Sequence, residues 1–293
     1  MLARMRVSWA LIRVALAVIL VASLSACANP PGTDDNLVNQ WPAMAAPTAW
    51  KPDAGVCLDE FQETARRASY KPIDCRQRHR YETVHIGEFT GVAANADATP
   101  AKNSEAYRTA WAECDAKASD YLGGPWQERK IWIGVSLPAA ASWQGGSRWY
   151  LCQMAMVEQV KGNVNAGNTS LKGQFDLPAI QFGCYQVDAE GKYEVKSCTE
   201  AHNTEFVGVV KWNSSYESMR AEATREGDKI HVECQKSVAT FAGAQVRTGT
   251  WNWSPSQADW EAGDQILRCY LYLGTTSVSK SLKGVGAAGW PLK

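Results

Sequence analysis

The same ordered pattern of residues occurs twice along this chain of 293 residues. In each copy a histidine follows the second cysteine by four positions, and a glutamate follows that histidine by three. The third cysteine precedes an aromatic residue by seven positions and a glycine by nine. A proline, a tryptophan and the fourth cysteine then follow at spacings of five and nine. The eight cysteines are Cys57, Cys75, Cys114 and Cys152 in the first copy and Cys184, Cys198, Cys234 and Cys269 in the second. Agreement at this many spacings predicts a tandem duplication.

The N-terminus has the features of a bacterial lipoprotein signal. Arg4, Arg6 and Arg13 form a basic region, residues 14–24 form a short apolar run, and small residues precede Cys27. An apolar run of this length is typical of a signal peptide rather than a membrane-spanning helix. We therefore expect residues 1–26 to be removed and Cys27 to become a lipidated, palmitate-carrying first residue at the outer face of the cytoplasmic membrane. The alternative is an ordinary secretory signal followed by a chance cysteine.

The repeat and the local composition predict the domain boundaries. Residues 27–49 contain prolines and polar residues without periodicity, which is typical of a flexible stalk. The predicted segments are copy 1 at residues 50–159, a polar linker at 160–178, copy 2 at 179–281 and a C-terminal tail at 282–293. The tetrapeptide Ser-Leu-Lys-Gly follows each copy, at residues 170–173 and 281–284.

Each copy combines helical and strand-like patterns. Residues 104–122 and 216–242 have apolar positions at helical spacing, although Gly227 and Asp228 interrupt the second run. Strand-like runs lie at residues 84–87, 131–135 and 149–152 in copy 1 and at 205–210, 251–253 and 267–273 in copy 2. The predicted fold class is α+β, with two small, duplicated, disulfide-stapled domains in tandem after a lipoprotein signal peptide.

Export and an even cysteine count favour disulfides. Removing Cys27 from nine cysteines leaves eight, and exported proteins meet oxidising conditions in which disulfides persist. If each copy folds as a unit, three symmetric pairings remain. We favour joining the first cysteine to the second and the third to the fourth in each copy. The predicted bridges are Cys57–Cys75, Cys114–Cys152, Cys184–Cys198 and Cys234–Cys269.

His79 with Glu82, and His202 with Glu205, are the candidate polar pairs. Imidazole and carboxylate can act together in acid–base catalysis, so an enzyme acting on envelope polymers is one hypothesis. A metal-binding module is another, since Cys-x3-His-x2-Glu offers sulfur, nitrogen and oxygen ligands to zinc. Retention of the pair in both copies favours a structural role, and no nucleophile or phosphate-binding motif recurs beside it. We therefore predict no catalytic residue, no metal and no cofactor.

Tryptophans and charge bear on possible partners. The chain has 13 tryptophans, and Trp143 and Trp260 hold equivalent positions for which we expect packing near the last disulfide. The unshared tryptophans either pack in the core or form a ligand face for a glycan or peptide. Without the three signal arginines, 27 basic residues face 30 acidic ones, a net charge of −3. This balance argues against a nucleic-acid partner.

The repeated unit resembles the septum-formation domain family of exported and membrane-anchored actinobacterial proteins. The resemblance rests on Gly55-Val56-Cys57, Cys75-x3-His79-x2-Glu82 and Pro138-x4-Trp143-x8-Cys152, and on their counterparts in copy 2. It implies an envelope protein associated with cell division or wall assembly, and it supplies no catalytic residues. We expect a non-enzymatic lipoprotein that binds an envelope protein or a cell-wall component and is attached to the membrane by its lipid.

Overall fold

The computed structural model describes residues 48–159, 163–223 and 229–292. The predicted signal peptide, Cys27, most of the stalk, and Gly227 with Asp228 lie outside these residues. Contacts within the chain separate residues 1–48 from residues 49–293, and every helix and strand named below belongs to the second of these units. Within the described ranges, no helix combines the length and the apolar character needed to span a bilayer.

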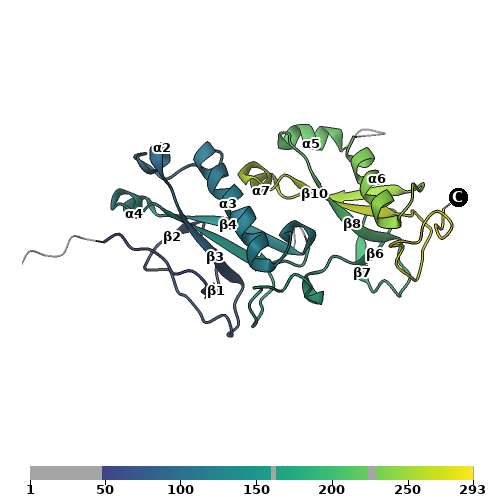
Figure 1. Cartoon of the computed structure of the whole chain (residues 1–293), viewed down its shortest axis with the longest axis horizontal. Helices are drawn as coiled ribbons and strands as arrows, with labels where there is room; N and C mark the ends of the chain where they lie inside the picture. Colours follow the sequence, from purple (N-terminus) through teal and green to yellow (C-terminus); the bar gives the residue numbers. More distant parts are fainter. Residues whose placement is uncertain (1–47, 160–162, 224–228, 293) are drawn as a thin grey trace, which may run out of the picture. The chain divides into compact units, whose positions relative to one another are not determined.

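Residues 49–181, here called the first half, contain a five-stranded sheet with the order β1-β3-β5-β4-β2 (Figure 1). Its strands are β1 (Cys57–Leu58), β2 (Thr64–Ala65), β3 (Tyr81–Glu88), β4 (Ile131–Pro138) and β5 (Trp149–Met156). All neighbouring strands are antiparallel except β2 and β4, which are parallel. The short elements of this half are α2 (Gly91–Ala94), η2 (Trp126–Glu128), α4 (Ala140–Gln144) and η3 (Pro178–Ile180).

One long helix, α3 (Glu105–Leu122), covers one face of this sheet. The Ser104 side chain accepts a hydrogen bond from the amide of Tyr107 and thereby caps the first turn. Gly123 ends the helix at a positive φ of 89°, a conformation that glycine adopts without steric cost. The buried side of the helix carries Tyr107, Ala110, Trp111, Cys114, Ala118 and Leu122. The helix predicted over residues 104–122 is thus present, with its first residue serving as the cap.

Residues 182–292, here called the second half, contain a five-stranded antiparallel sheet with the order β7-β6-β8-β10-β9. Its strands are β6 (Cys184–Val187), β7 (Tyr193–Lys196), β8 (Thr204–Lys211), β9 (Gly249–Trp253) and β10 (Ile266–Tyr272). Its helices are α5 (Tyr216–Glu222), α6 (Lys229–Ala242) and α7 (Gln257–Ala262). Helix α6 packs against β8, β9 and β10, as α3 packs against β3, β4 and β5.

The two sheets share four strands in the same spatial order and differ in the fifth. Strands β1, β3, β5 and β4 correspond to β6, β8, β10 and β9. In the first half the additional strand β2 pairs with β4, whereas in the second half the additional strand β7 pairs with β6, at the opposite edge. The mixed helix and sheet content agrees with the predicted α+β class. The divergence lies in the chain between the first two cysteines of each half.

Parts of the segments predicted as linker and tail that the structure describes pack against the folded halves. Leu171 and Ile180 are buried in the core of the first half, and Leu282 and Trp290 are buried in the core of the second. The polar composition of residues 160–178 suggested a linker. Whether a segment is buried, however, depends on a few apolar residues rather than on its average polarity. These contacts extend each folded half beyond residues 159 and 281.

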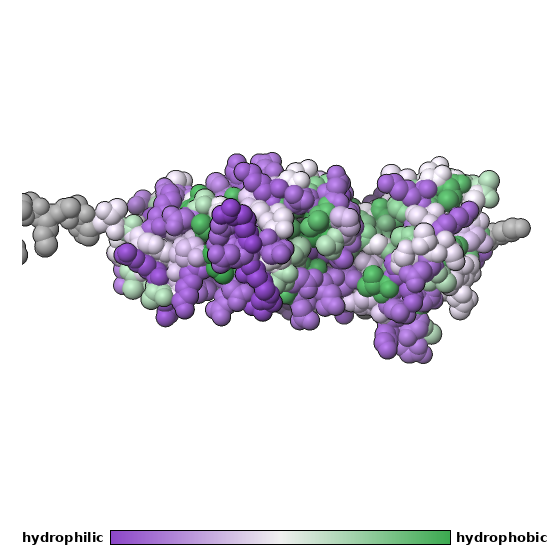
Figure 2. Space-filling model, turned by 90° about the horizontal axis from the view of Figure 1, so that it is seen from below, coloured by the Kyte–Doolittle hydropathy of each residue, from purple (hydrophilic) through white to green (hydrophobic). Residues whose placement is uncertain are grey.

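The surface seen in Figure 2 is predominantly hydrophilic, with smaller hydrophobic areas between polar ones. Among large hydrophobic side chains of the described residues, Val92, Tyr193, Val195 and Val232 are exposed. Scattered exposed apolar residues are normal for a folded protein, so their number alone does not identify a binding surface.

Candidate functional site

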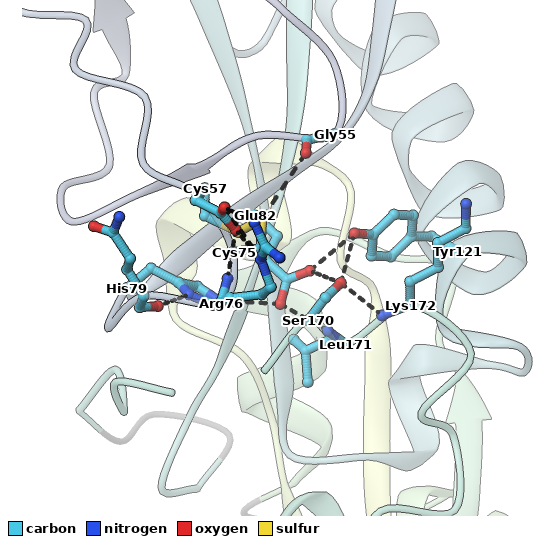
Figure 3. Close-up of a disulfide and its surroundings, with 12 residues drawn as sticks. Gly55, Cys57, Cys75, Arg76, His79, Glu82, Tyr121, Ser170, Leu171 and Lys172 are labelled. Atoms are coloured by element: carbon cyan, nitrogen blue, oxygen red, sulfur yellow. Dashed lines mark hydrogen bonds and ion pairs between the residues drawn. A yellow bond between two sulfur atoms is a disulfide. The ribbon is translucent and has the colours of Figure 1, made fainter. Parts of the chain in front are cut away.

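The first predicted polar pair lies beside β3, next to the Cys57–Cys75 disulfide (Figure 3). His79 precedes β3 by two residues, and Glu82 is the second residue of that strand. Both side chains are buried, His79 at 3% and Glu82 at 1% exposure. The spacing of three residues brings the His79 Nε2 atom to 3.3 Å from the Glu82 Oε1 atom. The structure therefore joins the two residues that the sequence pattern paired.

Glu82 is an acceptor for several donors from distant parts of the chain. Its Oε1 atom accepts the backbone N–H of Leu171 at 2.7 Å. Its Oε2 atom accepts the hydroxyls of Ser170 at 2.8 Å and Tyr121 at 2.9 Å (Figure 3). Burial raises the pKa of Tyr121 to about 12, although its hydrogen bond with Ser170 opposes this rise. The Tyr121 hydroxyl therefore stays protonated at neutral pH and donates a hydrogen bond to the carboxylate.

His79 is held on both sides. Its Nδ1 atom lies 2.8 Å from the carbonyl oxygen of Gln77, so the Nδ1–H group donates to that carbonyl. Its backbone N–H and C=O exchange hydrogen bonds with those of Gly167. Together with the contact to Glu82, these bonds tie residues 167–171 to the start of β3. The pair thus attaches residues 167–171, which lie far along the sequence, to the sheet of the first half.

The second half repeats this arrangement around Glu205. The His202 Nε2 atom lies 3.2 Å from Glu205 Oε1, and the His202 Nδ1 atom lies 2.8 Å from the carbonyl oxygen of Glu200. Glu205 accepts hydrogen bonds from the Ser281 hydroxyl at 2.7 Å and from the Leu282 backbone N–H at 2.8 Å. The backbone of His202 exchanges hydrogen bonds with that of Val278. The contacts match those of the first half, donor for donor, with one exception.

The exception is the position of Tyr121, where the second half has Phe241. Both residues follow the third cysteine of their half by seven positions. Phenylalanine has no hydroxyl, so Glu205 lacks the donor that Tyr121 gives Glu82. The rest of the arrangement is retained without it, which shows that the serine, the backbone N–H and the histidine form its common part.

The Ser-Leu-Lys-Gly tetrapeptides donate hydrogen bonds to the two glutamates. The sequence showed that the tetrapeptide recurs, but its spacing from the glutamate, about 80 residues, gave no sign of contact. In each half the serine hydroxyl and the following backbone N–H bind the carboxylate, and the glycine N–H donates to the backbone of residue 121 or 241. A recurring short motif downstream of each copy was the available signal for this contact. We call each arrangement of histidine, glutamate and tetrapeptide the glutamate clasp.

The possible metal ligands are engaged in other bonds. Cys57, His79 and Glu82 have donor atoms close to one another, and so do Cys184, Cys198 and Glu205. The cysteine sulfurs of both groups form the disulfides Cys57–Cys75 and Cys184–Cys198. Zinc binds thiolate sulfur, and a disulfide has no thiolate. In the oxidised chain these groups therefore do not supply the sulfur ligand that the spacing suggested.

The structure contains the four disulfides that the symmetric pairing favoured, namely Cys57–Cys75, Cys114–Cys152, Cys184–Cys198 and Cys234–Cys269. In each half one bridge joins the first strand to the segment before the histidine. The other bridge joins the long helix to the central strand that carries the last cysteine. The second of these bridges joins the helix and sheet layers that the hydrophobic core also holds together.

Trp143 and Trp260 are core residues with equivalent hydrogen bonds. Each side chain is 1% exposed and lies in the same hydrophobic cluster as the helix-to-strand disulfide of its half. The Trp143 indole N–H donates to the carbonyl of Ala96, and that of Trp260 donates to the carbonyl of Ser214. Buried indoles generally satisfy their N–H in this way. These contacts agree with the expected packing near the last disulfide.

Comparison with known families gives a match that spans both halves. The model described as Septum formation matches residues 54–269, from just before Cys57 to Cys269. A search of curated proteins and a search of solved structures gave no significant match. The matched range includes both pairs of disulfides, both histidine–glutamate pairs and both buried tryptophans. The chain therefore belongs to the septum formation family, which links it to the formation of the division septum.

Proposed function

We propose that the chain is a non-enzymatic, lipid-anchored binding protein that contributes to septum formation at the outer face of the cytoplasmic membrane. In this proposal it consists of two copies of one domain, and it binds an envelope protein or a cell-wall component. The lipid on Cys27 holds it at the membrane, and residues 28–49 separate the folded part from the lipid. The two folded copies supply the binding surfaces.

The observation that carries the proposal is the state of the shared polar residues. His79, Glu82, His202 and Glu205 are all at most 3% exposed, and their polar atoms bind other parts of the chain. A catalytic acid or base must reach the substrate proton, and these groups face the protein interior instead. Because the recurring residues build the scaffold, binding is expected on surfaces where the halves differ.

The N-terminal sequence and the disulfides support the proposed location. Small residues directly before Cys27 are typical of lipoprotein processing, and the short apolar run is typical of a signal peptide. Four disulfides are expected in a protein that folds outside the cytoplasm. Two independent features of the chain thus favour export.

The test is the cellular position of the full chain, carrying a C-terminal tag, in its native host. We expect the tagged chain at division sites in the membrane fraction, and abnormal septa after deletion of its gene. Cys27→Ala is the matched control, which should release the chain from the membrane without altering the folded domains. Uniform distribution around the cell, together with normal septa after deletion, would contradict the division role.

A further inference from the structure

A segment of the first half crosses the face of the sheet that α3 leaves uncovered. Cys152 of β5 forms its disulfide with Cys114 of α3, so the adjacent residues Leu151 and Gln153 point to the opposite face. The chain leaves β1 at one edge, forms β2 at the other edge, and returns to Ile73, which pairs with Cys57 of β1. We call residues 59–72 the strap.

The strap is held in place at several points. The Cys57–Cys75 disulfide and the backbone bonds between Ile73 and Cys57 fix its returning end. The Ser69 hydroxyl donates to the Gln62 side chain at 2.7 Å, joining the two passes of the strap. The Tyr70 hydroxyl donates to the carbonyl of Asp53. These bonds keep the strap at a defined position over the sheet, so the space beneath it is preformed.

A cavity of about 600 Å³ lies between the strap and the sheet. This volume is within the range of small-molecule sites in proteins. Ser136 of β4 and Leu151 and Gln153 of β5 form its floor, and strap residues form its walls. Apolar wall residues are Leu58, Ala65, Ala68, Pro72 and Ile73. The cavity therefore combines an apolar wall with a floor that contains two polar side chains.

The floor has hydrogen-bonding groups without protein partners. Ser136 and Gln153 are each 1% exposed, and the Ser136 hydroxyl donates to the Gln153 Oε1 atom at 3.1 Å. Among the described residues, the Gln153 Nε2 atom makes no hydrogen bond. Thr83 faces Gln153 across the β3–β5 ladder, and its buried hydroxyl also has no partner in the described part of the chain. Buried polar groups of this kind are normally satisfied, so a bound molecule would complete the floor.

Three charged residues line the cavity, and two of them, of opposite sign, form no ion pair among the described residues. Glu60 and Lys71 lie on the strap, are exposed, and have no ion-pair partner among the described residues. Asp59, a third charged lining residue, pairs with Arg80 at 3.0 Å and is thereby neutralised. A ligand that carries one ammonium and one carboxylate would match the two remaining charges.

The second half fills the equivalent positions with aromatic rings. Counting from the shared cysteines, prolines and glutamates, Thr83, Ser136 and Gln153 correspond to Phe206, Trp253 and Tyr270. The rings of Trp253 and Tyr270 lie 4.7 Å apart, and those of Phe206 and Tyr270 lie 5.5 Å apart. The same three positions thus form a packed aromatic cluster in one half, whereas in the other half they are polar and two of them, Ser136 and Gln153, belong to the floor of a cavity. The cavity is a local feature of the first half rather than a property of the shared scaffold.

We propose that this cavity binds a short zwitterionic peptide with small apolar side chains. A peptide carbonyl would accept a hydrogen bond from Gln153 Nε2, its ammonium group would face Glu60, and its terminal carboxylate would face Lys71. The small apolar side chains would contact the walls of the strap. This inference rests on the proposed role of the chain as a binding protein, and it names one ligand class for the first half.

The test uses tri-L-alanine as the probe and the full chain in detergent micelles, with binding measured by titration calorimetry. We expect saturable binding at one site and at least tenfold weaker binding by Gln153→Leu. Lys71→Ala and Glu60→Ala should each weaken binding about threefold or more, and both residues are exposed, so these variants keep the fold. N-acetyl-trialanine amide, which lacks both charges, should bind more weakly than tri-L-alanine.

Lys280→Ala and Glu190→Ala are matched controls, because they remove exposed charges from the second half. Both should bind tri-L-alanine as the unaltered chain does. The proposal is overturned if tri-L-alanine shows no saturable binding, or if Gln153→Leu and Lys71→Ala both bind it as tightly as the unaltered chain does. Selective binding of an uncharged disaccharide would also overturn it. If tri-L-alanine does not bind but the tagged chain still marks division sites, the cavity proposal fails and the proposed function stands.

Discussion

The faces of the two sheets that lie away from the long helices differ more than any other equivalent regions. In the first half the strap crosses this face and encloses a polar cavity over Ser136 and Gln153. In the second half the shorter loop turns back as the β6–β7 hairpin, and Tyr193 of β7 contacts Trp253 of β9, with ring centroids 5.0 Å apart. β7 and β9 are opposite edges of this sheet, so the aromatic side chains bridge its outer face.

This difference shows how one scaffold can carry two kinds of surface. An apolar sheet face is exposed to water unless another part of the chain packs against it. The first half covers it with chain, and its first two cysteines are 18 positions apart. The second half covers it with aromatic rings, and its first two cysteines are 14 positions apart. The helix, the two disulfides and the glutamate clasp are independent of that choice. The two halves therefore share these scaffold contacts and differ in the surfaces that their outer faces present.

The largest expected effect tests whether the two glutamate clasps are equivalent. Glu82→Ala and Glu205→Ala each leave a serine hydroxyl and a buried backbone N–H without an acceptor. We expect a loss of about 4 kcal/mol in the free energy of unfolding for each variant, measured by urea denaturation followed by circular dichroism. Unchanged stability with lost cellular activity would instead favour a catalytic role for the glutamates.

Tyr121→Phe tests the same comparison, because it gives the first clasp the phenylalanine that the second clasp has at position 241. We expect a loss of about 1 kcal/mol, since one neutral donor is removed and the contacts of Glu82 with Ser170, Leu171 and His79 remain. The reciprocal variant Phe241→Tyr should recover part of this energy in the second half if its hydroxyl reaches Glu205. A loss from Tyr121→Phe as large as that from Glu82→Ala would show that the tyrosine is not an optional donor.

The next comparison concerns the disulfides that hold the two divergent loops. Replacing Cys57 and Cys75 together, or Cys184 and Cys198 together, by alanine should cost about 3 kcal/mol in either half, because the closed loops are similar in length. Unfolding in denaturant measures this cost. The consequence for binding should differ, because only the first pair fixes the strap. Calorimetry should show weaker tri-L-alanine binding after the first replacement and unchanged binding after the second.

The smallest expected effect is a response to acid that the halves do not share. The Tyr150 hydroxyl donates to Glu113, and this bond, with the neighbouring His85, lowers the pKa of the Glu113 carboxyl. A carboxyl whose folded pKa is below its unfolded value stabilises the fold above the unfolded pKa, near 4.3, and this contribution is lost as the pH falls through the folded pKa.

Leu267 occupies the position of Tyr150 in the second half, two residues before the last cysteine, so it offers no such donor. Tyr150→Phe should therefore reduce the loss of stability between pH 6 and pH 3, by under about 1 kcal/mol because Glu113 is partly exposed. Thermal unfolding at several pH values measures the change. An identical pH profile in the variant would mean that the bond does not stabilise the folded chain.

The repeated spacings predicted much of the scaffold correctly. A fixed offset from cysteine to histidine to glutamate places the last two on one short segment, so their contact follows from local geometry. The apolar period over residues 104–122 and the glycine after it define α3, since helix formation and termination depend on nearby residues. The duplication reduced the cysteine pairings to three, and the structure contains the favoured one.

The sequence by itself determined the residues common to both halves and the main helices and strands, and it narrowed the disulfide pairings to three. Only the tertiary structure decided that Glu82 and Glu205 bind the tetrapeptides that follow each copy, and that Leu171, within the predicted linker, belongs to the core of the first half. It also decided that Ser136 and Gln153 lie beneath a strap while their counterparts pack as aromatic rings. These contacts join residues far apart in the chain, and no local pattern encodes them, because they depend on the strand order and on the path that each loop takes across its sheet.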